Sequence, residues 1–195
     1  MAILLSVFLL IGVLPFNAFA YDETGTFDAA GGTVTYEVLK DNTIAITGCE
    51  DTVTEIVIPD KIKGKPVTVI SREAFWHNET LVSVKFPANL TTIELYAFSG
   101  CTALERADFS ACTKGISLGD SAFSGAILLK EVAFPAGVTD MQELAFSGCH
   151  SLSKVDISKS TALTVIPNYA FDRTALTEFT VPDCVTQIGN GAFQW

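Results

Sequence analysis

The chain has 195 residues, enough for one ordinary domain, and its 12 basic and 22 acidic side chains give it a net charge of −10. Nucleic-acid backbones and anionic membrane surfaces repel a chain of this charge, so the composition argues against nucleic acid as a partner. Charged residues make up only 17% of the chain and Phe occurs 14 times, which argues against a disordered protein.

Residues 1–20 carry no charged side chain and are almost wholly apolar up to Pro15. The segment Ala18-Phe19-Ala20 then supplies the small-x-small pattern that signal peptidase cleaves. The apolar run is too short to span a bilayer, which takes about 20 residues. We expect a signal peptide over residues 1–20 and a mature chain that starts near Tyr21, leaves the cytoplasm and inserts into no membrane. The other interpretation is a buried N-terminal helix.

Residues 21–52 contain a predicted β-hairpin. Apolar and polar side chains alternate over residues 33–39 and again over 43–47, and Lys40-Asp41-Asn42 between them is typical of a turn. The repeats that follow would otherwise expose the strand edge of their first unit, which invites aggregation. We therefore expect this hairpin to be an N-terminal cap.

The rest of the chain is a repeat array marked by Ala-Phe, which occurs six times at steps of 22–25 residues. The six phenylalanines are Phe75, Phe98, Phe123, Phe146, Phe171 and Phe193. Each unit contains the pattern L-x-x-φ-x-φ, where φ is apolar; its alternation predicts a strand, which Pro or Ser ends. Units this short cannot bury an apolar face alone, so they must stack, with parallel strands and the six rings in the core. We also expect a short 3₁₀ or one-turn helix around each Ala-Phe.

This pattern resembles the BspA-like, or treponemal-type, leucine-rich repeat, most clearly in AFSGCTALERADFS and AFSGCHSLSKVDIS. The resemblance covers residues 53–195. It implies a curved leucine-rich-repeat solenoid of the α/β-horseshoe type, with about six coils of mostly short parallel strands. It also implies a secreted or cell-surface protein of host-associated bacteria, a class in which some members are adhesins. No polar cap follows the last Ala-Phe, so either a further segment follows Trp195, which we expect, or the last coil is left open.

The cysteines and histidines predict no chemical site. Equivalent cysteines such as Cys101 and Cys149 stand two or three coils apart, about 10–15 Å at the strand spacing, and a disulfide needs Cα atoms within about 7 Å. We therefore expect free, buried thiols. His77 and His150 are three coils apart, and no hydrolase, metalloprotease or phosphate-loop motif occurs. We expect no catalytic residue, no cofactor and no metal.

The outward side of the L-x-x-φ-x-φ strands, here called the strand face, is the predicted binding surface. Its first row is Glu55, Ser83, Arg106, Glu131, Lys154 and Glu178, and its second row is Val57, Lys85, Asp108, Ala133, Asp156 and Thr180. One interpretation is a solvated face on which opposite charges pair across strands. The other is a ligand surface, since solenoid faces are extended and rigid. Trp76 stands where other coils have Ser or Asp, so we expect it to be exposed, either as an isolated surface aromatic or as a contact residue.

Three functions remain open. The first, which we favour, is a secreted or cell-surface module that binds a protein or glycan on host or bacterial surfaces, with adhesion as one use. The second is a structural spacer in a larger surface protein. The third is an accessory repeat region of an enzyme whose catalytic domain lies outside this chain.

Overall fold

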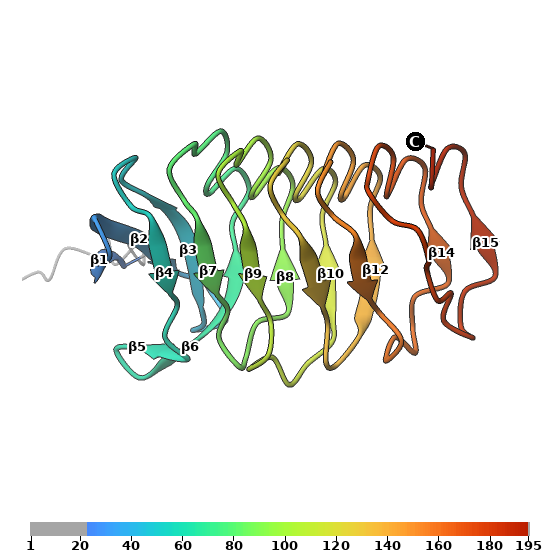
Figure 1. Cartoon of the computed structure of the whole chain (residues 1–195). Helices are drawn as coiled ribbons and strands as arrows, with labels where there is room; N and C mark the ends of the chain where they lie inside the picture. Colours follow the sequence, from blue (N-terminus) through green and yellow to red (C-terminus); the bar gives the residue numbers. More distant parts are fainter. Residues whose placement is uncertain (1–22, 195) are drawn as a thin grey trace, which may run out of the picture.

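The computed structural model describes residues 23–194, which form a β-solenoid of stacked coils (Figure 1). Its described part contains fifteen short strands and no helix. The stacked-repeat fold predicted from the Ala-Phe period is therefore confirmed. The predicted signal peptide at residues 1–20 lies outside the described residues.

One wall of the solenoid is built from the L-x-x-φ-x-φ segments, which pair in parallel as predicted. Two ladders form it: β4 (Glu55–Val57), β7 (Ser83–Lys85) and β9 (Arg106–Asp108), followed by β11 (Glu131–Ala133) and β13 (Lys154–Asp156). The register sets equivalent residues side by side, so that Ser83 pairs with Arg106 and Glu131 pairs with Lys154. The strand face is thus the outward side of this wall.

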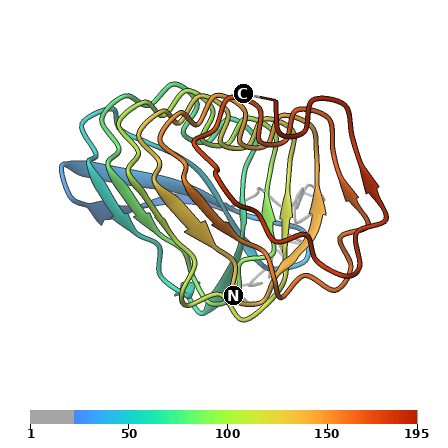
Figure 2. The ribbon, with the colours of Figure 1, turned by 45° about the vertical axis from the view of Figure 1, so that its right-hand side comes forward.

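A second wall of parallel strands was not predicted. Its members are β3 (Ile44–Cys49), β6 (Lys65–Ile70), β8 (Thr92–Ile93), β10 (Ile116–Leu118) and β12 (Val138–Met141), continued by the pair β14 (Val165–Ile166) and β15 (Gln187–Ile188). Figure 2 shows how each coil runs from one wall to the other. Most of these strands have two or three residues in each coil, too short for alternation to mark them in the sequence.

The N-terminal end carries an antiparallel meander of β1 (Thr24–Ala29), β2 (Gly32–Val38) and β3 (Figure 1). The hairpin predicted over residues 33–47 corresponds to β2 and β3, whereas β1 was not predicted. Strand β3 also pairs in parallel with β6, so the meander continues the second wall. Its capping role stays a prediction. Next to it, β5 (Lys61–Ile62) and β6 form a small hairpin in which Lys63 and Gly64 both have positive φ, as a tight two-residue turn requires.

The third wall consists of the turns around each Ala-Phe, and the helical turns expected there are wrong. Around Phe98, Tyr96 has a φ of 55° and Gly100 has a φ of 73°. A right-handed helix cannot include residues with such φ values. Instead, successive backbone N–H groups donate alternately to a carbonyl of their own coil and to a carbonyl of the next coil. The Ala97 N–H donates to the Glu94 carbonyl of its own coil, and the Phe98 N–H donates to the Ala122 carbonyl of the next coil. Residues at the same two positions in the other coils also have positive φ: Glu73, His77, Ser121, Gly125, Leu144, Gly148, Tyr169, Arg173 and Gly191.

The core contains the predicted column of Ala-Phe rings. Centroids of successive rings from Phe75 to Phe193 lie 4.8, 5.0, 5.3, 5.5 and 5.4 Å apart. The first five rings are buried, while Phe193 in the last described coil is 40% exposed. A second column, formed by Phe86, Phe109 and Phe134, runs behind the strand face with centroids 4.3 and 4.5 Å apart. These columns fix the spacing of the strands that carry the candidate site.

Candidate functional site

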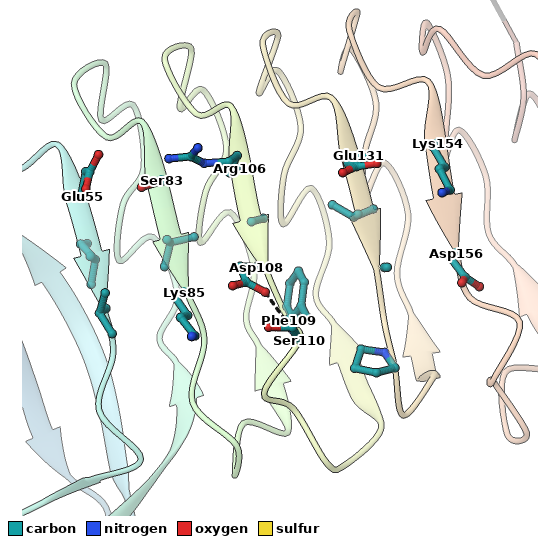
Figure 3. Close-up of a pocket in the computed structure, with 17 residues that line it drawn as sticks. Glu55, Ser83, Lys85, Arg106, Asp108, Phe109, Ser110, Glu131, Lys154 and Asp156 are labelled. Carbon is teal, nitrogen blue, oxygen red and sulfur yellow. Dashed lines mark hydrogen bonds between the residues drawn. The ribbon is translucent and has the colours of Figure 1, made fainter.

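The strand face is hollowed where β4, β7, β9, β11 and β13 lie side by side (Figure 3). The hollow has a volume of about 730 Å³. Eight of the ten charged or hydroxyl residues predicted as a binding face line it: Glu55, Ser83, Lys85, Arg106, Asp108, Glu131, Lys154 and Asp156. The structure thus gathers these residues on one surface, and their role in binding stays a prediction.

Glu178 and Thr180 do not line the hollow, and the strand predicted at their positions is wrong, while their part in the binding face stays a prediction. No strand forms at their positions, and neither residue lines the hollow. Among the described residues, no backbone hydrogen bond joins 176–181 to β13. Within residues 23–194 the segment has a neighbouring coil on one side only, so a shift away from β13 loses one ladder of hydrogen bonds where an inner strand would lose two.

Apolar side chains lie among the charged residues of the hollow. Val57 and Ala133 come from the second row, and Ala107 and Pro135 also line the hollow. Val57 is 70% exposed, a large fraction for an aliphatic side chain. The sequence analysis recognised Pro135 as the residue that ends a strand, and only the structure shows that it also lines the hollow.

Asp108 and Asp156 have a structural role that the sequence analysis missed. The Ser110 N–H donates to Asp108 Oδ1 at 2.8 Å, and the Ser158 N–H donates to Asp156 Oδ1 at 3.0 Å. Hydrogen bonds from Ser110 hold the pKa of Asp108 below its usual value, and those from Ser158 do the same for the pKa of Asp156. Both coils have Ser where other coils have Pro, which has no N–H to satisfy. In these two coils the carboxylate therefore accepts a hydrogen bond from the backbone N–H at the end of the strand. The coils with proline at this position have no such N–H group.

Opposite charges of the strand face do not form close ion pairs, although Lys85 and Lys154 add to the lowering of the pKa of Asp108 and Asp156 after the hydrogen bonds from Ser110 and Ser158. In the described part of the chain, no ion pair within 4.0 Å joins two charged residues of this face. The ion pairs that do form lie elsewhere: Lys65–Glu23, Arg72–Glu73, Lys130–Glu105 and Arg173–Asp172. Contact with Lys130, at 2.6 Å, also lowers the pKa of Glu105 on the neighbouring coil. Arg106 and Lys154 thus remain available to a ligand.

Arg106 is the most prominent of the free cations. Its side chain extends from β9 toward β7, where the short side chain of Ser83 leaves space for the guanidinium (Figure 3). No side-chain hydrogen bond of Arg106 to another of the described residues is formed. A guanidinium offers five N–H donors in a planar fork that matches a carboxylate or phosphate.

Trp76 is 53% exposed, which confirms the predicted exposure. It lies on the third wall, here called the turn wall, which the turns around each Ala-Phe form. Its ring packs edge-on against the ring of His77 with the centroids 4.7 Å apart, and Trp76 does not line the hollow. Sequence reasoning missed the pair Ile127 and Leu128, which are 37% and 42% exposed on the turn that leads into β11. Other coils have Glu79-Thr80 or His150-Ser151 there, so a comparison between repeats would have shown them.

The histidines have local partners rather than one another. His77 packs beside Trp76, and Nδ1 of His150 lies 3.1 Å from the carbonyl oxygen of Arg173. Over residues 23–194, no three His, Cys, Asp or Glu side chains come together as ligands for a metal ion. None of these residues forms a helix long and apolar enough to cross a membrane. What the hollow offers is a fork of donors, two ammonium groups, carboxylates and apolar side chains, which suits non-covalent binding.

A family described as the BspA type leucine rich repeat region matches residues 68–195 in six copies. No curated protein matches the chain. Among solved structures, a leucine rich cell surface protein from Faecalibacterium prausnitzii A2-165 is 27% identical with a TM-score of 0.61. That match covers 88% of this chain and 52% of the Faecalibacterium protein, so the chain spans about half the length of that protein.

Two more distant structures share the fold alone. The pneumococcal vaccine antigen PcpA is 21% identical with a TM-score of 0.62, and the match covers 87% of this chain and 47% of PcpA. The leucine rich repeat protein TpLRR from T. pallidum is also 21% identical, with a TM-score of 0.53 over 85% of this chain and 82% of TpLRR.

Proposed function

The chain belongs to the BspA-type leucine-rich repeat family, and from that premise we propose that it is a secreted or cell-surface module that binds another protein through its strand face. The observation that supports this most directly is the hollow of about 730 Å³, which gathers eight charged or hydroxyl residues of five successive strands on one rigid surface. Adhesion to host or bacterial surfaces is the use that we propose for such a module.

Two further observations support this proposal, and the first of them favours it over a spacer without a ligand. The charged residues of the face form no ion pairs with one another, although their register places Glu131 beside Lys154. A face whose only task is to be solvated gains from such pairs, by about 0.2–1 kcal/mol each. The Faecalibacterium protein, above 25% identity, is itself described as a cell surface protein, which supports the proposed location. No catalytic step is part of this proposal.

The experiment is a pull-down with the mature chain on extracts of host matrix and of bacterial surfaces. Wild type is compared with Arg106→Glu/Lys154→Glu, which reverses two cations inside the hollow. The matched control is Lys61→Glu/Lys114→Glu, which makes the same change in net charge at two exposed lysines outside the hollow.

We expect a partner that wild type and the control variant recover and the face variant does not. Both variants have the same net charge, so long-range electrostatic effects on the partner are alike. A difference in recovery between them therefore reflects contact at the strand face. Equal recovery by the two variants would remove the strand face from the function and favour a spacer.

A further inference from the structure

We propose that the strand face opens at the seam between β9 and β11, and that the ion pair of Lys130 with Glu105 holds this seam closed. The seam is the boundary between the two ladders of the strand face, and the hollow spans both ladders. Opening therefore widens the hollow between Arg106 on β9 and Glu131 on β11 (Figure 3). This inference goes beyond the proposed function, because the seam opens or stays closed whether or not the face binds a partner.

The backbone hydrogen bonds of the strand face are interrupted at the seam. The N–H groups of Phe86 and Phe134, at the ends of their strands, each donate to a carbonyl of the next coil at 2.9 Å. Phe109 stands at the same place on β9, and its N–H has no such acceptor. Among the described residues, no backbone hydrogen bond joins residues 104–110 to residues 129–135. The two strand edges therefore face each other without a ladder to resist their separation.

The seam follows one of the two longest coils. Phe98 and Phe123 are 25 residues apart, as are Phe146 and Phe171, whereas the other steps are 22 or 23 residues. Strand β9 belongs to the first of these coils and β13 to the second. The strand face loses its ladder after β9 and again after β13, so the break recurs with the coil length.

The other two walls are continuous across the same coils. On the second wall, β10 pairs in parallel with both β8 and β12. On the turn wall, the Phe98 N–H donates to the Ala122 carbonyl at 2.7 Å, and the Gly100 N–H donates to the Ser124 carbonyl at 2.8 Å. Opening is therefore confined to the strand face, and the two bonded walls form its hinge.

The core behind the seam is also less regular. The rings of Phe109 and Phe134 meet across it with centroids 4.5 Å apart and planes inclined by 41°, whereas Phe86 and Phe109 within the first ladder are inclined by 19°. Ala107 stands on β9 where the neighbouring coil has the larger Val84, so fewer apolar contacts close the seam. Phe109 itself lines the hollow, which thus reaches the core at this point.

One side-chain hydrogen bond crosses the seam among the described residues. Nζ of Lys130, just before β11, donates to Oε2 of Glu105, just before β9, at 2.6 Å. Both side chains are exposed, so salt screens their attraction and a substitution of either removes it. The ion pair is therefore the adjustable part of the closure.

The test is amide-resolved NMR on the mature chain without a ligand. Hydrogen exchange compares the amide of Phe109 with those of Phe86 and Phe134, whose side chains are buried to the same degree. Relaxation dispersion follows motion on the μs–ms timescale in β9 and β11, with β7, which pairs on both sides, as the reference.

The variant that removes the ion pair is Glu105→Gln. Its matched control is Glu73→Gln, which removes a similarly exposed acid from the pair Arg72–Glu73 on the turn wall. Urea midpoints verify that each variant is folded, and Lys130→Gln replaces Glu105→Gln if that variant is not.

We expect the Phe109 amide to exchange at least about a hundredfold faster than those of Phe86 and Phe134, because no hydrogen bond must break first. We expect dispersion in β9 and β11 and none in β7. Glu105→Gln should raise the population of the open state about two- to fivefold, and about 0.5 M salt should act in the same direction. Glu73→Gln should leave this population unchanged.

Three results would overturn the inference: a Phe109 amide as protected as that of Phe86, dispersion in β9 and β11 no larger than in β7, or equal effects of Glu105→Gln and Glu73→Gln on the open state. None of these results removes the proposed function, because a face that stays closed still presents the hollow to a partner. Equal recovery by the two variants of the pull-down would in turn leave the opening of the seam untouched.

Discussion

The rings of Phe98 and Phe123 stack with their centroids 5.0 Å apart and their planes inclined by 2°, and Phe146 continues the stack from Phe123 at 5.3 Å. Phe123 is fully buried between two coils. Phe123→Ala leaves a cavity in the middle of this column, so we expect the free energy of unfolding to fall by about 3–5 kcal/mol. Urea unfolding followed by far-UV circular dichroism measures the loss.

Trp76→Ala serves as the comparison for that substitution. Trp76 is a large aromatic residue too, but it is exposed on the turn wall, so we expect a loss under about 1 kcal/mol. Similar losses for Trp76→Ala and Phe123→Ala would contradict the assignment of Phe123 to the core.

Asp108→Ala tests the role assigned to the acid at the strand end. The substitution leaves the Ser110 N–H without its acceptor at 2.8 Å, and we expect a loss of about 1 kcal/mol in unfolding free energy. Adding Ser110→Pro should restore most of this loss, because Pro has no N–H and stands at the same place in the coils of Pro87 and Pro135. A double variant no more stable than Asp108→Ala would contradict the idea that proline at the strand end can replace the hydrogen bond between Ser110 and Asp108.

The pH dependence of the same variant gives an independent readout. The folded-state pKa of Asp108 is lowered by its hydrogen bonds with Ser110, so its stabilisation is complete above the unfolded-state pKa of about 3.9 and is lost as the pH falls through the lower folded value. We expect wild type and Asp108→Ala to differ in urea midpoint at neutral pH and to converge as the pH falls through the lowered folded-state pKa of Asp108. A difference that stays constant over this range would assign the loss to packing.

Gly100→Ala should cost more than Gly64→Ala. Both glycines have positive φ, 73° and 80°, which an alanine adopts at a cost of about 1 kcal/mol or more. A Cβ on Gly64 would meet nothing within 4 Å, whereas one on Gly100 would lie 2.7 Å from Nδ1 of His77. Adding His77→Ala should lower the cost of Gly100→Ala to that of Gly64→Ala, as thermal unfolding can show. An unchanged cost would rule out the His77 contact as the cause.

All five cysteines are free, as predicted, but only three of them are buried, so the predicted burial is wrong for Cys49 and Cys184. Burial raises the pKa of Cys101, Cys112 and Cys149 to about 12, so almost no thiolate exists at about pH 8. We expect iodoacetamide to leave these three unmodified in the native protein and to modify all five in urea without reductant, as peptide mass spectrometry would show. Two cysteines that stay unmodified in urea until reductant is added would instead reveal a disulfide.

Removal of residues 21–49 from the mature chain tests the predicted cap. The deletion exposes the edge of β6, including Val67 and Ile70, which are fully buried in the intact protein. An unpaired, apolar strand edge recruits other chains, so we expect oligomers or aggregates where the intact chain is monodisperse. Size-exclusion chromatography with light scattering distinguishes the two. A deletion variant as monodisperse and as stable as the intact chain would show that β1–β3 are not a cap.

The sequence by itself determined the repeat, the parallel strands of the first wall, the buried column of rings and the free thiols. These properties follow from spacing. A residue that recurs every 22–25 positions must meet its equivalents when coils stack, and an alternating segment must turn one side inward. Eight residues of the predicted binding surface came together for the same reason, because equivalent positions in a regular stack share one face.

Only the tertiary structure decided the turns, the second wall and the state of the charges. Whether the Ala-Phe segment coils into a helix or alternates its hydrogen bonds depends on the carbonyls of the next coil, such as Ala122 for Phe98, and no local propensity contains that information. Likewise Arg106 and Glu131 are opposite charges on one row, but whether they pair depends on side-chain directions across neighbouring coils. The absence of a strand at Glu178 also depends on its neighbours, since a short strand is held by the coils that border it more than by its own residues.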